Sequence, residues 1–137
     1  MINNQPPIIV SSLDLVRLTK LIESLPPKYL PGIDALQCEL DRATIVEPGE
    51  VPSGVVTMNS KVRFVDELSK NTFELTLVYP EDGGNADRVS ILAPVGGALL
   101  GLSVGQSIFW QVPGGQKLQL TILEVIFQPE AAGELLR

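Results

Sequence analysis

The first third of the chain repeats apolar residues at the spacing of a helix. Apolar positions recur every three or four residues in two runs, which is typical of the a/d seam of a coiled coil. Ser11 or Ser12 can cap the first helix, and Pro26-Pro27 ends it. About seven proline-rich residues, 26–32, separate the runs, so the pattern predicts a short antiparallel helical hairpin with arms of about 17–21 Å. The runs are Leu15, Leu18, Ile22 and Leu25, then Ile33, Leu36, Leu40 and Ala43.

The period changes from helical to two after a linker rich in proline and glycine at residues 47–54. Apolar and polar side chains alternate through residues 72–79 and again through residues 61–64. This alternation is typical of strands with one buried face. A third strand is predicted at Arg88–Leu92, directly after a turn-rich acidic loop at residues 81–87.

The last third of the chain predicts one short helix and a hairpin. Pro94 can start a helix at its first turn, and Gly101 can end it. Residues 107–112 and 117–126 are predicted to pair around the turn Pro113-Gly114-Gly115. A mostly antiparallel sheet with one short helix makes the fold class α+β.

We therefore predict two domains: an N-terminal helical hairpin at residues 1–47 and a sheet domain at residues 48–137. The sheet region has enough large apolar side chains for us to expect that it folds alone. Residues 89–116 contain no charged side chain, but their prolines and glycines interrupt any apolar helix of about 20 residues, so no membrane span is predicted.

Composition excludes several chemistries. The chain has 10 Lys and Arg against 16 Asp and Glu, a net charge of −6, which argues against nucleic acid as the primary ligand. It has no histidine, so no Ser-His-Asp system or histidine-ligated zinc can form. Cys38 is the single cysteine and cannot form an intrachain disulfide. The absence of a signal-like segment at the N-terminus leads us to expect a cytoplasmic protein.

Individual residues that could carry chemistry have simpler interpretations. Glu39 and Asp41 diverge on a helix and are predicted to form a solvated face. The acidic residues at 81–87 lack the spacing of a calcium loop and are predicted to solvate a hairpin end. Trp110 is expected to pack in the core rather than to stack on a ligand, and Cys38 to be a partly exposed, inert thiol.

The hairpin tip leaves two interpretations open. Lys28 and Tyr29 can either anchor a partner or form a solvated turn. No catalytic residue, metal site or cofactor is predicted from the residues. They indicate a non-catalytic interaction protein.

Five segments together resemble the bacterial regulators of nucleoside diphosphate kinase, the Rnk family. The resemblance extends from about residue 8 to 133. More distantly, the second domain is similar to the C-terminal domain of the Gre transcript-cleavage factors, which has an FKBP-like fold. The segments are Glu39-Leu40-Asp41-Arg42-Ala43, Val56-Thr57-Met58-Asn59-Ser60, Leu77-Val78-Tyr79-Pro80, Ala93-Pro94-Val95-Gly96-Gly97-Ala98-Leu99-Leu100-Gly101-Leu102 and Gln128-Pro129-Glu130-Ala131-Ala132-Gly133.

The resemblance implies docking on RNA polymerase at the entrance of the secondary channel, through the second domain. The Ser-Pro-Leu-Gly docking segment of Gre factors falls on Ala93, Pro94, Val95 and Gly96, with alanine in place of serine. Gre factors carry acidic residues at the tip of a long coiled coil, whereas residues 26–32 contain no acid. The resemblance therefore implies a competitor of Gre factors that does not stimulate cleavage.

Two alternative functions remain open. The family name implies an effect on nucleoside diphosphate kinase levels, and direct complex formation with that kinase is one route. The FKBP-like fold also suggests prolyl isomerase activity by analogy alone. We expect no such activity, because the sequence lacks an aromatic-rich pocket signature.

Overall fold

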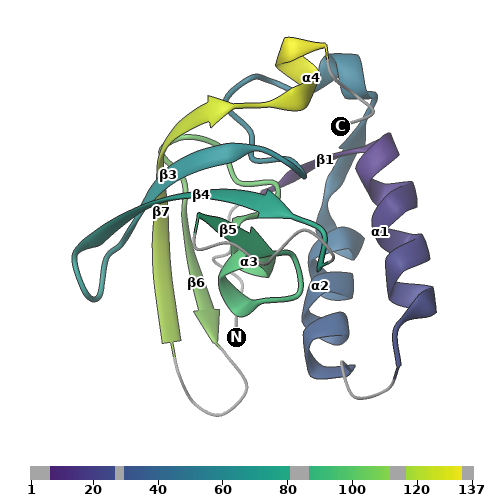
Figure 1. Cartoon of the computed structure of the whole chain (residues 1–137), viewed down its shortest axis with the longest axis horizontal. Coiled ribbons are helices and arrows are strands. Elements are labelled where there is room, and N and C mark those ends of the chain that lie inside the picture. The colour runs from purple at the N-terminus through teal and green to yellow at the C-terminus, as the bar shows by residue number, and fades with distance from the viewer. Residues whose placement is uncertain (1–6, 27–29, 81–86, 112–116, 134–137) are drawn as a thin grey trace.

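The computed structural model of the chain describes residues 7–26, 30–80, 87–111 and 117–133 (Figure 1). The N-terminal helices are followed by a mostly antiparallel sheet with one short helix between its strands, which confirms the predicted α+β fold class. In chain order the elements are β1 (Ile9–Ser11), α1 (Ser12–Ser24), α2 (Leu30–Arg42), β2 (Thr44–Val46), the 3₁₀ helix η2 (Pro48–Glu50), β3 (Lys61–Asp66), β4 (Asn71–Val78), β5 (Arg88–Ser90), α3 (Pro94–Leu99), β6 (Ser107–Gln111), β7 (Lys117–Phe127) and α4 (Pro129–Ala132).

The predicted helical hairpin is present, and α1 and α2 lie side by side in Figure 1. Ser11 caps α1, because its hydroxyl oxygen accepts the Asp14 backbone N–H at 3.0 Å. Each helix has 13 residues, which corresponds to about 20 Å. The seam residues Leu18, Leu36 and Leu40 are buried, as their spacing predicts.

Two short strands frame the hairpin and were not predicted. β1 leads directly into α1, and β2 follows α2. The two strands pair in parallel, with Ile9 opposite Thr44. Three residues are too few to show a period of two, so neighbouring apolar residues could not reveal these strands. α2 also begins at Leu30, before Pro31, because proline is tolerated in the first turn of a helix.

The predicted strands form one five-stranded sheet in the order β5-β4-β3-β7-β6. All neighbours are antiparallel except β4 and β5, which run parallel. The register between β3 and β7 shifts at two places, next to Val62 and Phe64. Such bulges bend and twist strands, and the sheet curls in Figure 1.

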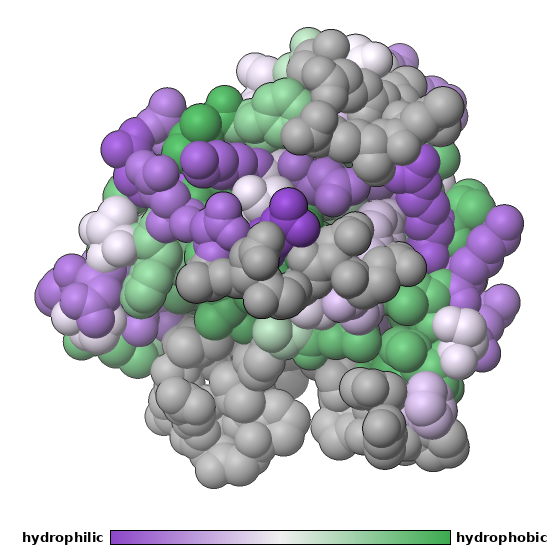
Figure 2. All heavy atoms as spheres, viewed as in Figure 1, coloured by the Kyte–Doolittle hydropathy of each residue, from purple (hydrophilic) through white to green (hydrophobic). Residues whose placement is uncertain are grey.

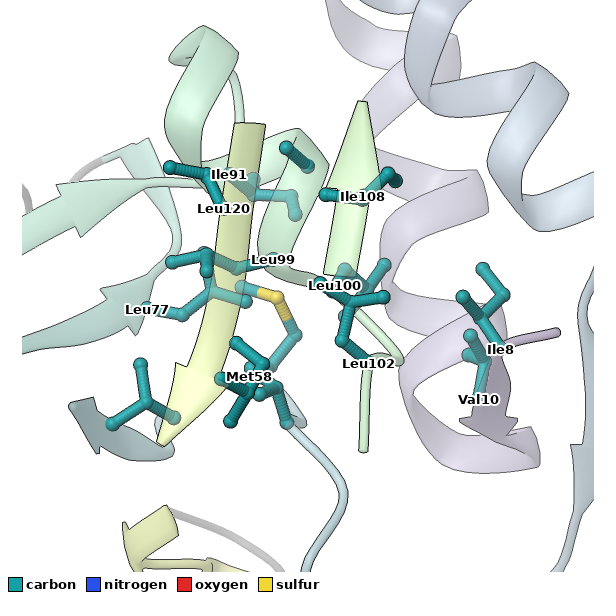
Figure 3. Packing of buried hydrophobic residues seen from close by; sticks show 14 of the residues in the cluster. Ile8, Val10, Met58, Leu77, Ile91, Leu99, Leu100, Leu102, Ile108 and Leu120 are labelled. Atoms are coloured by element: carbon teal, nitrogen blue, oxygen red, sulfur yellow. The ribbon is translucent and has the colours of Figure 1, made fainter. Parts of the chain in front are cut away.

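One hydrophobic core joins the hairpin to the sheet. Figure 3 shows Met58, Leu77 and Leu99 packed together, with Leu100 and Leu102 between them and the side chains of Ile8, just before β1, and Val10, in β1. α3 contacts β5, β6 and β7 and also α2. The core therefore crosses the boundary predicted at residues 47 and 48, and that division into domains stays a prediction.

The end of the described chain is fastened to the segment before the sheet. The Gln128 side-chain amide donates to the carbonyl oxygens of Pro52 and Val55 at 2.7 and 2.8 Å. Its side-chain oxygen accepts the Ala131 N–H and so caps α4. This short helix was not predicted.

Candidate functional site

The segment Ala93–Gly96 forms the start of α3. Ala93 occupies the N-cap position with an extended backbone, and Pro94 follows in the first turn, as predicted. Alanine has no side-chain oxygen, and α3 has no side-chain capping bond. The Ala93 N–H instead donates to the Ser90 carbonyl oxygen at 3.0 Å, which sets the chain direction between β5 and α3.

Gly96 is the residue that lets this segment approach β5. A Cβ atom built at Gly96 would lie 2.0 Å from the Ser90 carbonyl oxygen. That distance is shorter than any contact real Cβ atoms make. The predicted role of this glycine in docking is thus accompanied by a clear structural role.

The other predicted docking residues divide between surface and core. The Val95 side chain is half-buried and packs against the hydrophobic core. Ala93 is half-buried at the head of the segment. The Pro94 side chain lies outside the described residues. Ala93 is therefore the position at which the surface of this segment can be altered with least damage to the core.

The predicted hairpin-tip residues Lys28 and Tyr29 lie outside the described residues, as do residues 81–86. The Trp110 side chain does too, although its neighbour Ile108 is buried and Phe109 is exposed, in keeping with the predicted alternation. Cys38 is exposed, which agrees with its position off the helical seam.

The prediction of a solvated face at Glu39 and Asp41 is wrong for Glu39. Asp41 is exposed, whereas Glu39 is 5% exposed. Its carboxylate accepts hydrogen bonds from the Arg42 Nε and Nη2 atoms at 3.1 and 2.7 Å. A buried carboxylate needs such a partner, and the helical spacing of three residues supplies it.

A buried polar cluster joins the hairpin to the sheet and was missed from the sequence. Asp14 is 3% exposed, and its Oδ2 accepts the Met58 backbone N–H at 3.1 Å. Thr57, next to Met58, donates its hydroxyl to Glu130 Oε1 at 2.7 Å. Asp14 precedes Leu18 by one helical turn, so the apolar seam itself was the signal that this acid would be buried.

Burial changes the titration of the groups in this cluster. Burial raises the pKa of Asp14 to about 6, against the hydrogen bond from Met58, which lowers it. The nearby Glu130 charge raises the pKa of Asp14 further, and Arg17 lowers it. Burial likewise raises the pKa of the Tyr79 hydroxyl well above its ordinary value.

The surface and the acidic residues are the remaining places for a site within the described ranges. On the face drawn in Figure 2, hydrophilic and hydrophobic residues are interspersed. Across the ranges the structure describes, no group of three or more Asp, Glu or Cys side chains is arranged to hold a metal ion. Within those same ranges no helix is long and apolar enough to cross a membrane.

Both parts of the chain match known protein families. The model for the C-terminal domain of the transcription elongation factors GreA and GreB matches residues 51–127, and the model for the Rnk N-terminus matches residues 6–46. The chain is 46% identical over 134 residues to the regulator of nucleoside diphosphate kinase of Escherichia coli strain K12, covering 97% of this chain and 98% of that protein. The chain belongs to the Rnk branch of the GreA/GreB family.

The chain is also similar in sequence and in structure to other members of the GreA/GreB family. A GreA of Thermodesulfovibrio yellowstonii is 30% identical over 97 residues, which is 70% of this chain and 61% of that protein. A solved structure described as a transcription elongation factor GreA/GreB from Nitrosomonas europaea superimposes with a TM-score of 0.70 at 52% identity. It covers 90% of this chain and 100% of that one. The sheet of this Rnk-branch chain thus has the fold of the GreA/GreB C-terminal domain.

Proposed function

We propose that the chain is a non-catalytic transcription regulator that binds RNA polymerase at the rim of the secondary channel and competes there with Gre factors. Family membership over nearly the whole chain is the observation that carries this proposal. The matched Gre region, residues 51–127, includes Ala93–Gly96. Binding to the polymerase requires a cytoplasmic protein.

The hairpin supports competition without transcript cleavage. Cleavage-stimulating factors need carboxylates at the tip of the coiled coil, where they help to hold a metal ion. Residues 26–32 contain no Asp or Glu, and each helix is about 20 Å long. A hairpin of this length can cover a docking site, but its tip at residues 26–32 has no carboxylate to bring to a metal ion.

The docking proposal predicts the effect of a charge at the head of α3. Ala93→Glu adds a bulky negative charge at a half-buried N-cap position, where an acid is compatible with the helix dipole. We expect at least about a tenfold loss of affinity for core RNA polymerase, measured by titration with the purified protein. Val104→Glu adds the same charge at a 48% exposed position of the same sheet region and serves as the matched control.

Competition is tested by adding a Gre factor to the same titration. Mutually exclusive binding and no stimulation of transcript cleavage are the expected results. Simultaneous binding of both proteins would contradict a shared site. Equal affinities of the wild-type chain and Ala93→Glu for RNA polymerase would contradict the proposal that Ala93–Gly96 is the docking segment.

A second route to regulation is direct binding to nucleoside diphosphate kinase. The name of the Escherichia coli relative is the observation that favours it. Co-elution of the purified chain and kinase in size-exclusion chromatography would support direct binding. Separate elution at concentrations above about 10 μM would leave regulation through transcription as the explanation.

A further inference from the structure

The base of the hairpin contacts a turn of the sheet region at residues 57–60. Asp14, in the first turn of α1, accepts the Met58 N–H across 44 residues of sequence. Met58 is 2% exposed, and its side chain lies within the hydrophobic core in Figure 3. The carboxyl group of Asp14 therefore connects the hairpin to the centre of the molecule. We call the contact of Asp14 with residues 57–60 the joint.

The same turn is also bonded to α4. Thr57 donates its hydroxyl to Glu130, and the Ser60 hydroxyl oxygen accepts the Thr57 N–H at 2.9 Å. Asn59 adopts a left-handed backbone with φ of 67°, which non-glycine residues rarely adopt. Two carboxylates from opposite ends of the chain thus hold one tightly bent turn.

The charges facing Asp14 do not balance when it is ionised. Glu130 on α4 is negative, Arg17 on α1 is positive, and Tyr79, at the end of β4, is neutral. Asp14 also has hydrogen bonds with two uncharged groups, the Ser11 hydroxyl and the Met58 N–H. A neutral Asp14 leaves Glu130 and Arg17 to compensate each other, whereas an ionised Asp14 leaves one buried negative charge in excess.

We propose that Asp14 makes the joint sensitive to protons, so that the joint is tightest when this carboxyl group is neutral and opens more often when it releases its proton to solvent. The neutral group keeps an oxygen that accepts the Met58 N–H and needs no counter-charge. Opening exposes the ionised group to water, which removes the cost of keeping it buried. The raised pKa of Asp14 agrees with this direction and lies close to neutral pH. The proposal does not depend on polymerase binding.

Amide hydrogen exchange of the full-length chain tests the proposal. Exchange of the Met58 amide, corrected for its intrinsic rate, reports opening of the joint, and the Ile122 amide reports the sheet. We expect Met58 to be less protected than Ile122, with a weaker dependence on denaturant. Between about pH 4 and pH 7 the protection of Met58 should fall about 100-fold, since two pKa units correspond to that factor.

Conservative variants separate the proton from the hydrogen bond. Asp14→Asn keeps an acceptor oxygen and cannot ionise, so Met58 protection should lose this pH dependence. Glu130→Gln removes the facing negative charge and should move the midpoint to lower pH. Asp34→Asn, at an exposed position on α2, is the matched control and should behave as wild type.

Three results would overturn the proposal. The first is Met58 protection that does not change with pH. The second is an equal pH dependence in wild type and Asp14→Asn. The third is Met58 exchange that matches Ile122 at every denaturant concentration, because the joint would then open only when the whole molecule unfolds.

Discussion

Asp14 and Glu39 are two buried carboxylates on the hairpin whose surroundings differ. Glu39 accepts two hydrogen bonds from Arg42 on the same helix. Asp14 is bonded to an uncharged backbone N–H, and a second carboxylate faces it. Helical spacing can bring a cation to an acid three residues away, but what faces the acid from a distant segment depends on packing.

The stability of the chain should depend on the ionisation of Asp14. Its pKa in the folded protein is about 6, above the ordinary value of 3.8, so the folded state binds this proton more tightly than the unfolded state. This contribution is complete below about pH 4 and is lost as the pH rises through 6. The loss amounts to about 3 kcal/mol of unfolding free energy.

Urea denaturation of wild type and Asp14→Asn between about pH 4 and pH 8 measures this contribution. The difference in unfolding free energy between the two proteins isolates Asp14 from the other carboxylates. The variant should gain relative stability as the pH rises. A difference that stays constant with pH would show that Asp14 has the same pKa in both states.

At the scale of elements, α3 combines a close backbone contact at its start with a buried core side chain, Leu99, at its end. Gly96 brings the first turn of the helix against the Ser90 carbonyl at the end of β5. The sequence predicted this helix from Pro94 and Gly101, and Gly101 indeed has a positive φ of 83°. What the spacing could not show is which strand the helix would touch.

Gly96→Ala should therefore destabilise the chain strongly. The new methyl group meets a backbone oxygen at 2.0 Å, and the helix must move away from β5 to admit it. We expect a loss of about 3 kcal/mol in unfolding free energy, measured by urea denaturation. Gly49→Ala meets nothing within 4 Å and should change stability by less than about 1 kcal/mol. Equal effects of the two substitutions would contradict the close approach.

At the scale of the whole molecule, the hairpin completes the core of the sheet region. Ile8, the residue before β1, packs against Gly101, and a Cβ on that glycine would lie 2.7 Å from the Ile8 side chain. The Ile9 N–H donates to the Gly101 carbonyl oxygen. The buried residues that the hairpin region contributes to the shared core are Ile8, Val10, Leu18, Leu36 and Leu40.

A chain of residues 48–137 alone should be much less stable than the full chain. Removing five buried side chains exposes their partners, and we expect a loss of more than about 5 kcal/mol of unfolding free energy. Urea denaturation and binding of a hydrophobic dye would measure it. Adding residues 1–47 as a separate peptide should restore part of the stability. Unchanged stability of the isolated sheet region would instead support the predicted division at residue 47.

The sequence by itself determined the local elements, because each depends on periodicity or on nearby residues. The seam from Leu15 to Ala43, the alternation from Thr72 to Tyr79 and the cap at Ser11 are all signals of this kind. Only the tertiary structure decided the pairing of β1 with β2, the hydrogen bond of Asp14 with Met58, the burial of Glu39, and the contact of Gly96 with Ser90. These features join segments far apart in the chain or depend on which face of a helix is covered, and such contacts leave no periodic trace in the sequence.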